Sequence, residues 1–432
     1  MDPRPHRRTP GERVSLLKNQ AFRLFWGAQT VSMVGTNMTR VAIPLLAAGT
    51  LAATPFQMGL LQAAQTVAFL LVGLPAGVLV DRSRRRPILI VSDVLRALLM
   101  AAIVVGFLLD AVTFAALLAV TLLVGLATAF FEIAYQSYIP VVVGRDNLVE
   151  GNARLESTNA VSRLAGPTLG GGLVQLAGAV ATVSVQAATH LVSAFLLSRI
   201  RTPETVPERT ERRRMGPEIR EGLRFVLREP VFRAITGSAA TYNFFYAVSL
   251  PLVMLLLVDE MGLSGTAVGV LMAVSGVGGV IGAALAGRLA RRIGQVRAMW
   301  TSYLVTVPTA LLIPFADSGW KCLLFAVPWF AMSFGIVVYN VGQVSIRQAL
   351  CPPELLGRMN ASVRFLVWGI LPLGSLTGGA LGEWLGVRGA LLVGGAGMSA
   401  GVLWLVFSRL RPLRDLPAPE ESPSGDGAPV RT

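Results

Sequence analysis

Glu132 lies within a long apolar stretch, where its carboxylate could take up and release a proton. A carboxylate inside a bilayer costs about 2.5–3.5 kcal/mol on insertion scales, so we expect this side chain to face a charged partner or water. With about 1.5 Å of rise per residue, Glu132 and Arg163 fall at similar depths on one side of the bilayer midplane, and Arg40 falls on the other side. Arg163 is therefore the expected partner, and protonation of Glu132 would break the pair.

A permanent ion pair is the alternative, because buried pairs also hold helices together without any further role. Other reactive groups are scarce. His6 lies near the start of the chain and His190 stands alone in an apolar stretch. The sequence contains no metal-ligand cluster, no nucleophile with a base and no phosphate-binding loop. It therefore predicts neither an enzyme nor a bound cofactor.

Polar side chains recur at helical spacing in several other apolar stretches. They could line an aqueous cavity, although such side chains more often hydrogen-bond between helices, and for any single one we favour that alternative. The candidates for a cavity lining are Gln29, Asn37, Gln136, Tyr242, Asn243, Tyr246, Asn340 and Gln343.

Membrane-spanning helices must position these residues, because 53% of the 432 residues are hydrophobic and only 14% are charged. Each crossing needs about 20 apolar residues. We expect an all-α membrane protein with twelve helices, near residues 22–49, 57–80, 88–109, 112–138, 154–178, 180–200, 231–258, 265–288, 297–316, 320–345, 360–382 and 387–409.

The formal charge of +14 would also suit a nucleic-acid-binding protein. However, arginine and lysine gather in every second loop between the predicted helices, which is the pattern of cytoplasmic loops. We therefore expect both chain ends in the cytoplasm and no nucleic-acid partner. By this topology Cys322 and Cys351 lie on opposite sides of the membrane, so they cannot form a disulfide within one chain.

The second half of the chain repeats the first. The segment GVLVDRSRRR at 77–86 recurs in weaker form at 283–292, 206 residues later, and residues 152–171 match residues 360–379 at an offset of 208. Such a repeat predicts two six-helix bundles with a binding site between them. The predicted parts are a cytoplasmic segment 1–20, bundles at 21–200 and 231–410, a cytoplasmic linker at 201–230 and a disordered tail at 411–432. Within the linker, residues 217–229 predict an amphipathic helix, either in the membrane plane or solvated.

The segment 77–86 resembles the signature loop between the second and third helices of major facilitator superfamily transporters. Gly77 permits close helix approach. The resemblance implies that Asp81 contacts helix eleven, near Arg364, and so latches one conformation. The alternative is that the arginines only set the topology. The expected gating residues are Gly77, Asp81, Arg82, Arg85, Arg86 and Arg364.

Residues 162–172 resemble the antiporter motif of the same superfamily, with Ser162 where the family usually has glycine. Small residues let a neighbouring backbone pack closely, and proline leaves a carbonyl free and bends the helix. The resemblance favours exchange over symport. Ordinary packing would explain the glycines but not the proline. The motif residues are Ser162, Gly166, Pro167, Gly170 and Gly171.

The runs FFEIAYQSYIP at 130–140 and LVEGN at 148–152 resemble the branch of the superfamily that contains macrolide-efflux proteins and an enterobactin exporter. The resemblance implies a transporter that exports an amphipathic small molecule, such as an antibiotic or a siderophore, by proton antiport and alternating access. It implies multidrug resistance as a role, and protons and the lipid bilayer as partners of a monomer in the bacterial cell (inner) membrane. Proton-coupled uptake and a non-transporting sensor are the alternatives.

Overall fold

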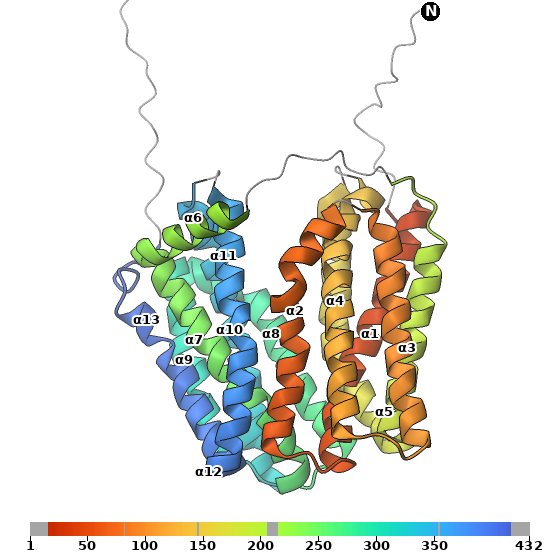
Figure 1. Cartoon of the computed structure of the whole chain (residues 1–432). Coiled ribbons are helices and arrows are strands. Elements are labelled where there is room, and N and C mark those ends of the chain that lie inside the picture. The colour runs from red at the N-terminus through yellow and green to blue at the C-terminus, as the bar shows by residue number, and fades with distance from the viewer. Residues whose placement is uncertain (1–15, 82, 145–146, 205–214, 353–354, 416–432) are drawn as a thin grey trace, which may run out of the picture.

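The computed structural model describes residues 16–81, 83–144, 147–204, 215–352 and 355–415 (Figure 1). These residues form helices and connecting turns, without any strand among them. The first half contains α1 (Gln20–Gly49), α2 (Pro55–Asp81), α3 (Arg85–Leu108), α4 (Phe114–Val143) and α5 (Leu148–Ser198). The second half, preceded by α6 (Met215–Arg228), contains α7 (Pro230–Leu255), α8 (Gly265–Ile293), α9 (Gln295–Thr306), α10 (Leu323–Leu350), α11 (Leu356–Gly369), α12 (Leu371–Ala400) and α13 (Leu403–Val406).

Short polar residues begin several of these helices. The side chains of Asn19, Thr113 and Ser264 accept hydrogen bonds from backbone N–H groups in the first turns of α1, α4 and α8. Such caps satisfy donors that the first turn of a helix leaves without partners. In an apolar sequence they mark where one helix starts and the preceding turn ends.

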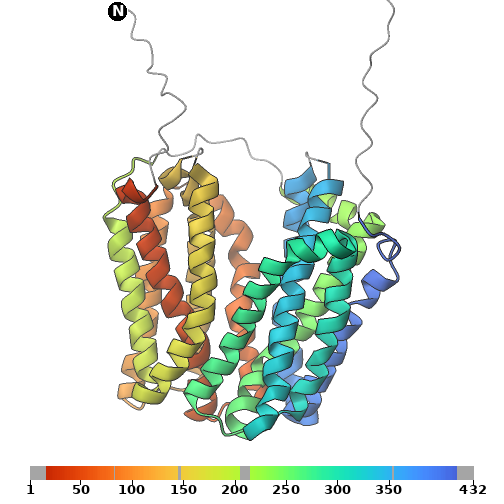
Figure 2. The same ribbon diagram turned by 180° about the vertical axis from the view of Figure 1, so that it is seen from behind.

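Ten segments of the described chain are long and apolar enough to cross a membrane. Two of them, residues 150–198 and 358–406, have 49 residues each. Gly178, with φ 84° and ψ 164°, interrupts the first, and Gly386, with φ 73° and ψ 168°, interrupts the second. Only glycine adopts such angles readily, and the two positions are 208 residues apart. At Gly178, where the predicted helices 154–178 and 180–200 meet, α5 turns back on itself (Figure 2).

The two halves form two bundles that lie side by side, α1–α5 in one and α7–α13 in the other (Figures 1 and 2). The helix α6, within the predicted linker, packs against α11 at one end of the second bundle. A Cβ on Gly222 would lie 2.5 Å from the carbonyl oxygen of Arg358, and Glu221 pairs with the guanidinium of Arg358 at 2.6 Å. This amphipathic helix is therefore attached to the bundle.

The two ends of the molecule differ in charge. Arg85, Arg86, Arg291 and Arg292 lie at the end where α6 packs, which we call the arginine-rich end. The opposite end, which we call the acidic end, carries Asp110, Asp259, Glu260, Asp317 and Glu383.

Candidate functional site between the two bundles

At the acidic end, α5 packs against α8 through glycines. A Cβ on Gly171 would lie 2.1 Å from the carbonyl oxygen of Gly265 and 3.0 Å from the Cα of Gly269. A Cβ on Gly269 would in turn lie 2.4 Å from the carbonyl oxygen of Pro167. Any larger residue would push the helices apart, so this contact depends on glycine.

The contact between α2 and α12 repeats this arrangement. A Cβ on Gly59 would lie 2.5 Å from the carbonyl oxygen of Ser375, and one on Gly379 would lie 2.9 Å from the Cα of Phe56. Gly379 follows Gly171 by 208 residues, and Gly265 follows Gly59 by 206. The repeat found in the sequence is thus present in the contacts between the bundles.

Each of these contacts also includes a side chain that accepts a hydrogen bond from a helix N-terminus in the other bundle. Gln175 Oε1 accepts from the backbone N–H of Thr266, the second residue of α8, at 3.2 Å. Glu383 Oε1 accepts from the backbone N–H of Phe56, the second residue of α2, at 3.3 Å. Gln175 and Glu383 are again 208 residues apart, so each bundle caps one helix of the other.

Described contacts between the bundles extend to the middle of α2, where the ring of Phe69 meets that of Trp368 edge-on at 6.3 Å. Beyond that level the bundles spread apart toward the arginine-rich end (Figure 2). The molecule is therefore joined at its acidic end.

The other motif glycines on α5 contact α1 within the first bundle. A Cβ on Gly166 would lie 2.4 Å from the Cβ of Asn37, and one on Gly170 would lie 2.3 Å from the carbonyl oxygen of Met38. Ser162 is buried. Thus Gly171 and Pro167 contact the second bundle, whereas Gly166 and Gly170 face α1.

Part of the predicted gating loop lies outside the described residues. Gly77 and Asp81 belong to α2, but their side chains are not among those described, and Arg82 is not described at all. Arg364 places its guanidinium over the ring of Trp368, 5.1 Å from the ring centroid and on the same helix.

Arg85 and Arg86, two of the expected gating residues of this loop, bind within the first bundle. The backbone N–H groups of Arg85 and Arg86 donate to the carboxylate of Glu204 at 2.5 and 3.2 Å. The Arg86 side chain donates to the carbonyl oxygens of Leu197, at 3.0 Å, and Ser198. These bonds join the start of α3 to the end of α5.

Glu132 is half-buried on α4, and it forms no ion pair within 4 Å with any arginine that the structure describes. The positive charges that act on it are, in decreasing order, those of Arg96, Arg163 and Arg40. Arg40 also interacts with Tyr246 of the second bundle. The residues predicted for proton coupling therefore interact electrostatically with one another, but the arginine with the strongest effect on Glu132 is Arg96, which the prediction omitted.

Arg163 is exposed, and its Nε donates to Asn159 Oδ1 at 3.1 Å, one turn away on α5. The expected direct pair between Glu132 and Arg163 is thus not formed in this conformation.

Sequence reasoning missed a buried polar cluster in the first bundle, and the statement that His190 stands alone was wrong. Asp93, Arg96, His190 and Ser193 are at most 3% exposed. The Asp93 carboxylate accepts hydrogen bonds from Arg96 at 2.5 Å and Ser193 at 2.7 Å, and lies 3.2 Å from His190 Nδ1. The signal in the sequence was Asp93 three residues before Arg96 in an apolar stretch, which puts opposite charges on one helix face.

Most of the polar residues predicted to line a cavity have local partners. Asn37 and Asn243 donate to carbonyl oxygens one turn earlier, and Gln343 donates to Asn340 at 3.2 Å. Tyr242 stacks on Tyr246 with ring centroids 5.9 Å apart. Gln29 is buried, whereas Gln136 is exposed.

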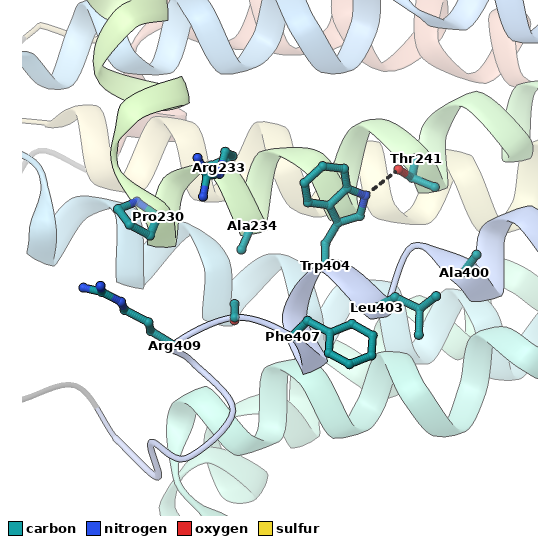
Figure 3. Close-up of a pocket in the computed structure, with 10 residues that line it drawn as sticks. Pro230, Arg233, Ala234, Thr241, Ala400, Leu403, Trp404, Phe407 and Arg409 are labelled. Atoms are coloured by element: carbon teal, nitrogen blue, oxygen red, sulfur yellow. Dashed lines mark hydrogen bonds between the residues drawn. The ribbon is translucent and has the colours of Figure 1, made fainter.

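An amphipathic groove of about 650 Å³ lies on the side of the second bundle away from the first, between α7 and α13 (Figures 1 and 3). Figure 3 shows the Trp404 indole pointing toward α7, where its Nε1 donates to Thr241 Oγ1 at 3.1 Å. Arg233 and Arg409 line one end of the groove. Because the groove opens on the outer face of one bundle, it is separate from the interface described above.

Comparison with known proteins gives consistent matches over nearly the whole chain. The model of a family described as transmembrane secretion effector matches residues 12–424. The MFS-type transporter YfiS of Bacillus subtilis is 26% identical over 401 residues, which cover 88% of this chain and 91% of YfiS. The enterobactin exporter EntS of Escherichia coli is 28% identical over 434 residues, which cover 95% of this chain and 98% of EntS.

Solved structures show the same fold. The nucleoside transporter NupG superposes with a TM-score of 0.72 and 11% identity, over 90% of this chain and 98% of NupG. A bacterial homologue of the iron transporter ferroportin, in an inward-facing state, superposes with a TM-score of 0.70 and 17% identity, over 90% of this chain and 99% of that protein. These proteins are transporters and not enzymes. With its ten apolar spans, two joined bundles and a family match at residues 12–424, the chain belongs to the transmembrane secretion effector family of the major facilitator superfamily.

Proposed function

We propose that this protein exports an amphipathic small molecule, such as an antibiotic or a siderophore, by alternating access driven by proton antiport. It acts as a monomer in the bacterial inner membrane. The chain crosses the membrane twelve times, because Gly178 and Gly386 each divide a 49-residue segment into two crossings. The arginine-rich end then lies in the cytoplasm, as the distribution of positive charge favours.

The observation that carries alternating access is the glycine contact at the acidic end. The bundles touch there through Gly171 and Gly265 and through Gly59 and Gly379, and they spread apart at the other end. A contact made of small residues can open without breaking strong bonds, because among the described residues it contains few side chains and two capping hydrogen bonds. In this conformation the substrate would enter from the cytoplasm.

Export is favoured over uptake by the names of the relatives, since the family is described as a secretion effector and EntS is an enterobactin exporter. Glu132 is the proposed coupling carboxylate. It is half-buried, has three arginine charges near it, and forms no described ion pair that would fix its charge.

The test is transport into inverted proteoliposomes with an imposed pH gradient, screened with amphipathic compounds of several classes. We expect wild-type protein to accumulate at least one class, and Glu132→Gln to lose gradient-driven accumulation while still binding the compound. Asp110→Asn is the matched control, because Asp110 is an exposed carboxylate with φ 51°, which asparagine tolerates. Gradient-driven accumulation by Glu132→Gln would place the coupling site elsewhere, and accumulation only in the opposite direction would mean uptake.

A further inference from the structure

The buried cluster around His190 joins four helices of the first bundle. His190 and Ser193 come from the second part of α5, and Asp93 and Arg96 come from α3. The ring of Phe131 on α4 lies 4.1 Å below the Arg96 guanidinium. Ser32 on α1 completes the cluster, with its Oγ 3.4 Å from His190 Nδ1.

With a neutral His190, both ring nitrogens of this residue have hydrogen-bond partners. With the proton on Nδ1, the ring donates to Asp93 Oδ1 at 3.2 Å, and Nε2 accepts from the amide nitrogen of Gln186 at 3.4 Å. The formal charges of Asp93 and Arg96 then cancel. A buried cluster with balanced charge and paired polar groups is stable.

Two polar atoms in and beside the cluster have no partner among the described residues, and one of them could accept a hydrogen bond from a protonated His190. Gln186 Oε1 has no hydrogen bond. If the amide of Gln186 rotates by half a turn, Oε1 accepts the new Nε2–H. Arg96 Nε is also buried and has no hydrogen bond. An acceptor for it would have to come from another group.

Glu132 can supply that acceptor. It follows Phe131, the residue whose ring contacts the Arg96 guanidinium, and Arg96 has the strongest electrostatic effect on it among the arginines. The charged groups that act on His190 are Arg96 and Asp93, and those that act on Arg96 are Asp93 and Glu132. Arg96 is therefore within electrostatic range of two carboxylates, and among the described residues Asp93 is the one that binds it in this conformation.

We propose that His190 is a proton-binding site of the transport cycle. When His190 gains a proton, the Arg96 side chain reorients toward Glu132 and so couples the two residues. A proton from water adds to Nε2, so the net charge of the Asp93, Arg96 and His190 group rises from zero to +1. Imidazolium then competes with Arg96 for the Asp93 carboxylate, and the guanidinium turns toward Glu132. No bond other than the N–H bond forms, and release of the proton restores the starting state. This inference rests on proton antiport as the proposed function.

The chain has only two histidines, His6 and His190, which allows a direct spectroscopic test. In the His6→Gln variant, histidine-selective isotope labelling gives a single ring signal, from His190, in protein reconstituted in nanodiscs. We expect this signal to move with pH between about 5 and 8. We expect Asp93→Asn and Glu132→Gln each to shift the midpoint by about one unit or more. The control is Thr121→Val. Thr121 is a buried, uncharged residue of α4, so this substitution should leave the midpoint unchanged.

Transport measurements complete the test. His190→Gln and Asp93→Asn should remove the pH dependence of transport over the same range, whereas Thr121→Val should retain it. Gradient-driven transport by wild type with a His190 signal that does not move would overturn the proton site. A midpoint that Glu132→Gln leaves unchanged would overturn the coupling through Arg96. Wild-type transport that ignores a pH gradient would instead overturn proton antiport itself, whatever the histidine signal does.

Discussion

At the scale of single residues, Gln175 and Glu383 control how the two bundles meet. Each accepts one backbone hydrogen bond from the second residue of a helix in the other bundle. The N-terminus of a helix has free N–H groups and a partial positive charge, so an amide oxygen or a carboxylate there stabilises it. Both bonds exist only while the acidic end is closed. They therefore stabilise one conformation of the transporter and not the other.

We predict that Gln175→Ala and Glu383→Ala each destabilise the closed acidic end by about 0.5–1 kcal/mol, which is a shift of about two- to fivefold in population. The measurement is the distance between spin labels at Asp110→Cys and Lys321→Cys in a cysteine-free background, one in each bundle. Asp259→Asn is the control, because Asp259 is exposed at the same end. Equal distance distributions in all variants would contradict a stabilising role for the two caps.

How far the sequence could predict these residues depends on the kind of signal. The glycines at 170 and 171 were predictable, because the match between residues 152–171 and 360–379 ends on them. Small residues in a membrane helix indicate close packing against a neighbouring helix. Asp93, Arg96 and His190 were missed because Asp93 and His190 are 97 residues apart, and only the folded bundle brings them within 3.2 Å. Arg163 was the expected partner of Glu132, but this pair is not formed in the structure, where Arg163 donates to Asn159 instead. Depth along a helix gives a level in the membrane but not a direction around the helix.

At the scale of elements, adjacent glycines of α5 serve different purposes, some for stability within one bundle and others for the contact that changes between conformations. Three successive glycines face three different surroundings. Gly170 faces the backbone of α1 in its own bundle, and Gly171 faces the backbone of α8 in the other bundle. A Cβ on Gly172 would have no atom closer than 4.0 Å. The same substitution at three adjacent positions should therefore have three different effects.

We predict that Gly170→Ala lowers the stability of the protein by about 1–3 kcal/mol through overpacking within the first bundle. Gly171→Ala should leave the amount of folded protein unchanged but shift the population away from the closed acidic end and slow transport. Gly172→Ala should behave as wild type. Thermal unfolding reports the first effect, and the spin-label distance described above reports the second. Loss of folded protein in Gly171→Ala would mean that the contact with α8 is needed for assembly rather than for the transport cycle.

At the scale of the whole molecule, the two ends differ in charge and in packing, which gives this transporter two distinguishable sides. The arginine-rich end carries the start of α3 and the amphipathic α6, and the acidic end carries the glycine contacts and their caps. The internal repeat predicted two similar bundles. It could not predict which end is closed, because both conformations use the same sequence and differ only in which small contacts form. The orientation in the membrane instead depends on the charge difference between the ends.

The two cysteines allow this orientation to be tested, because they lie at opposite ends. Cys322 is half-buried at the acidic end, and Cys351 follows α10 at the arginine-rich end. We predict that a membrane-impermeant maleimide labels Cys322 of the Cys351→Ser variant in sealed right-side-out vesicles and not in inverted ones. Burial raises the pKa of the Cys351 thiol, so at a given pH less of the reactive thiolate is present and this cysteine should label slowly from either side. The Cys322→Ser variant, labelled after solubilisation in denaturant, controls for that slow reaction. Labelling of Cys322 in inverted vesicles alone would place the arginine-rich end outside the cell, and with it would reverse both the proposed direction of transport and the side from which the substrate enters.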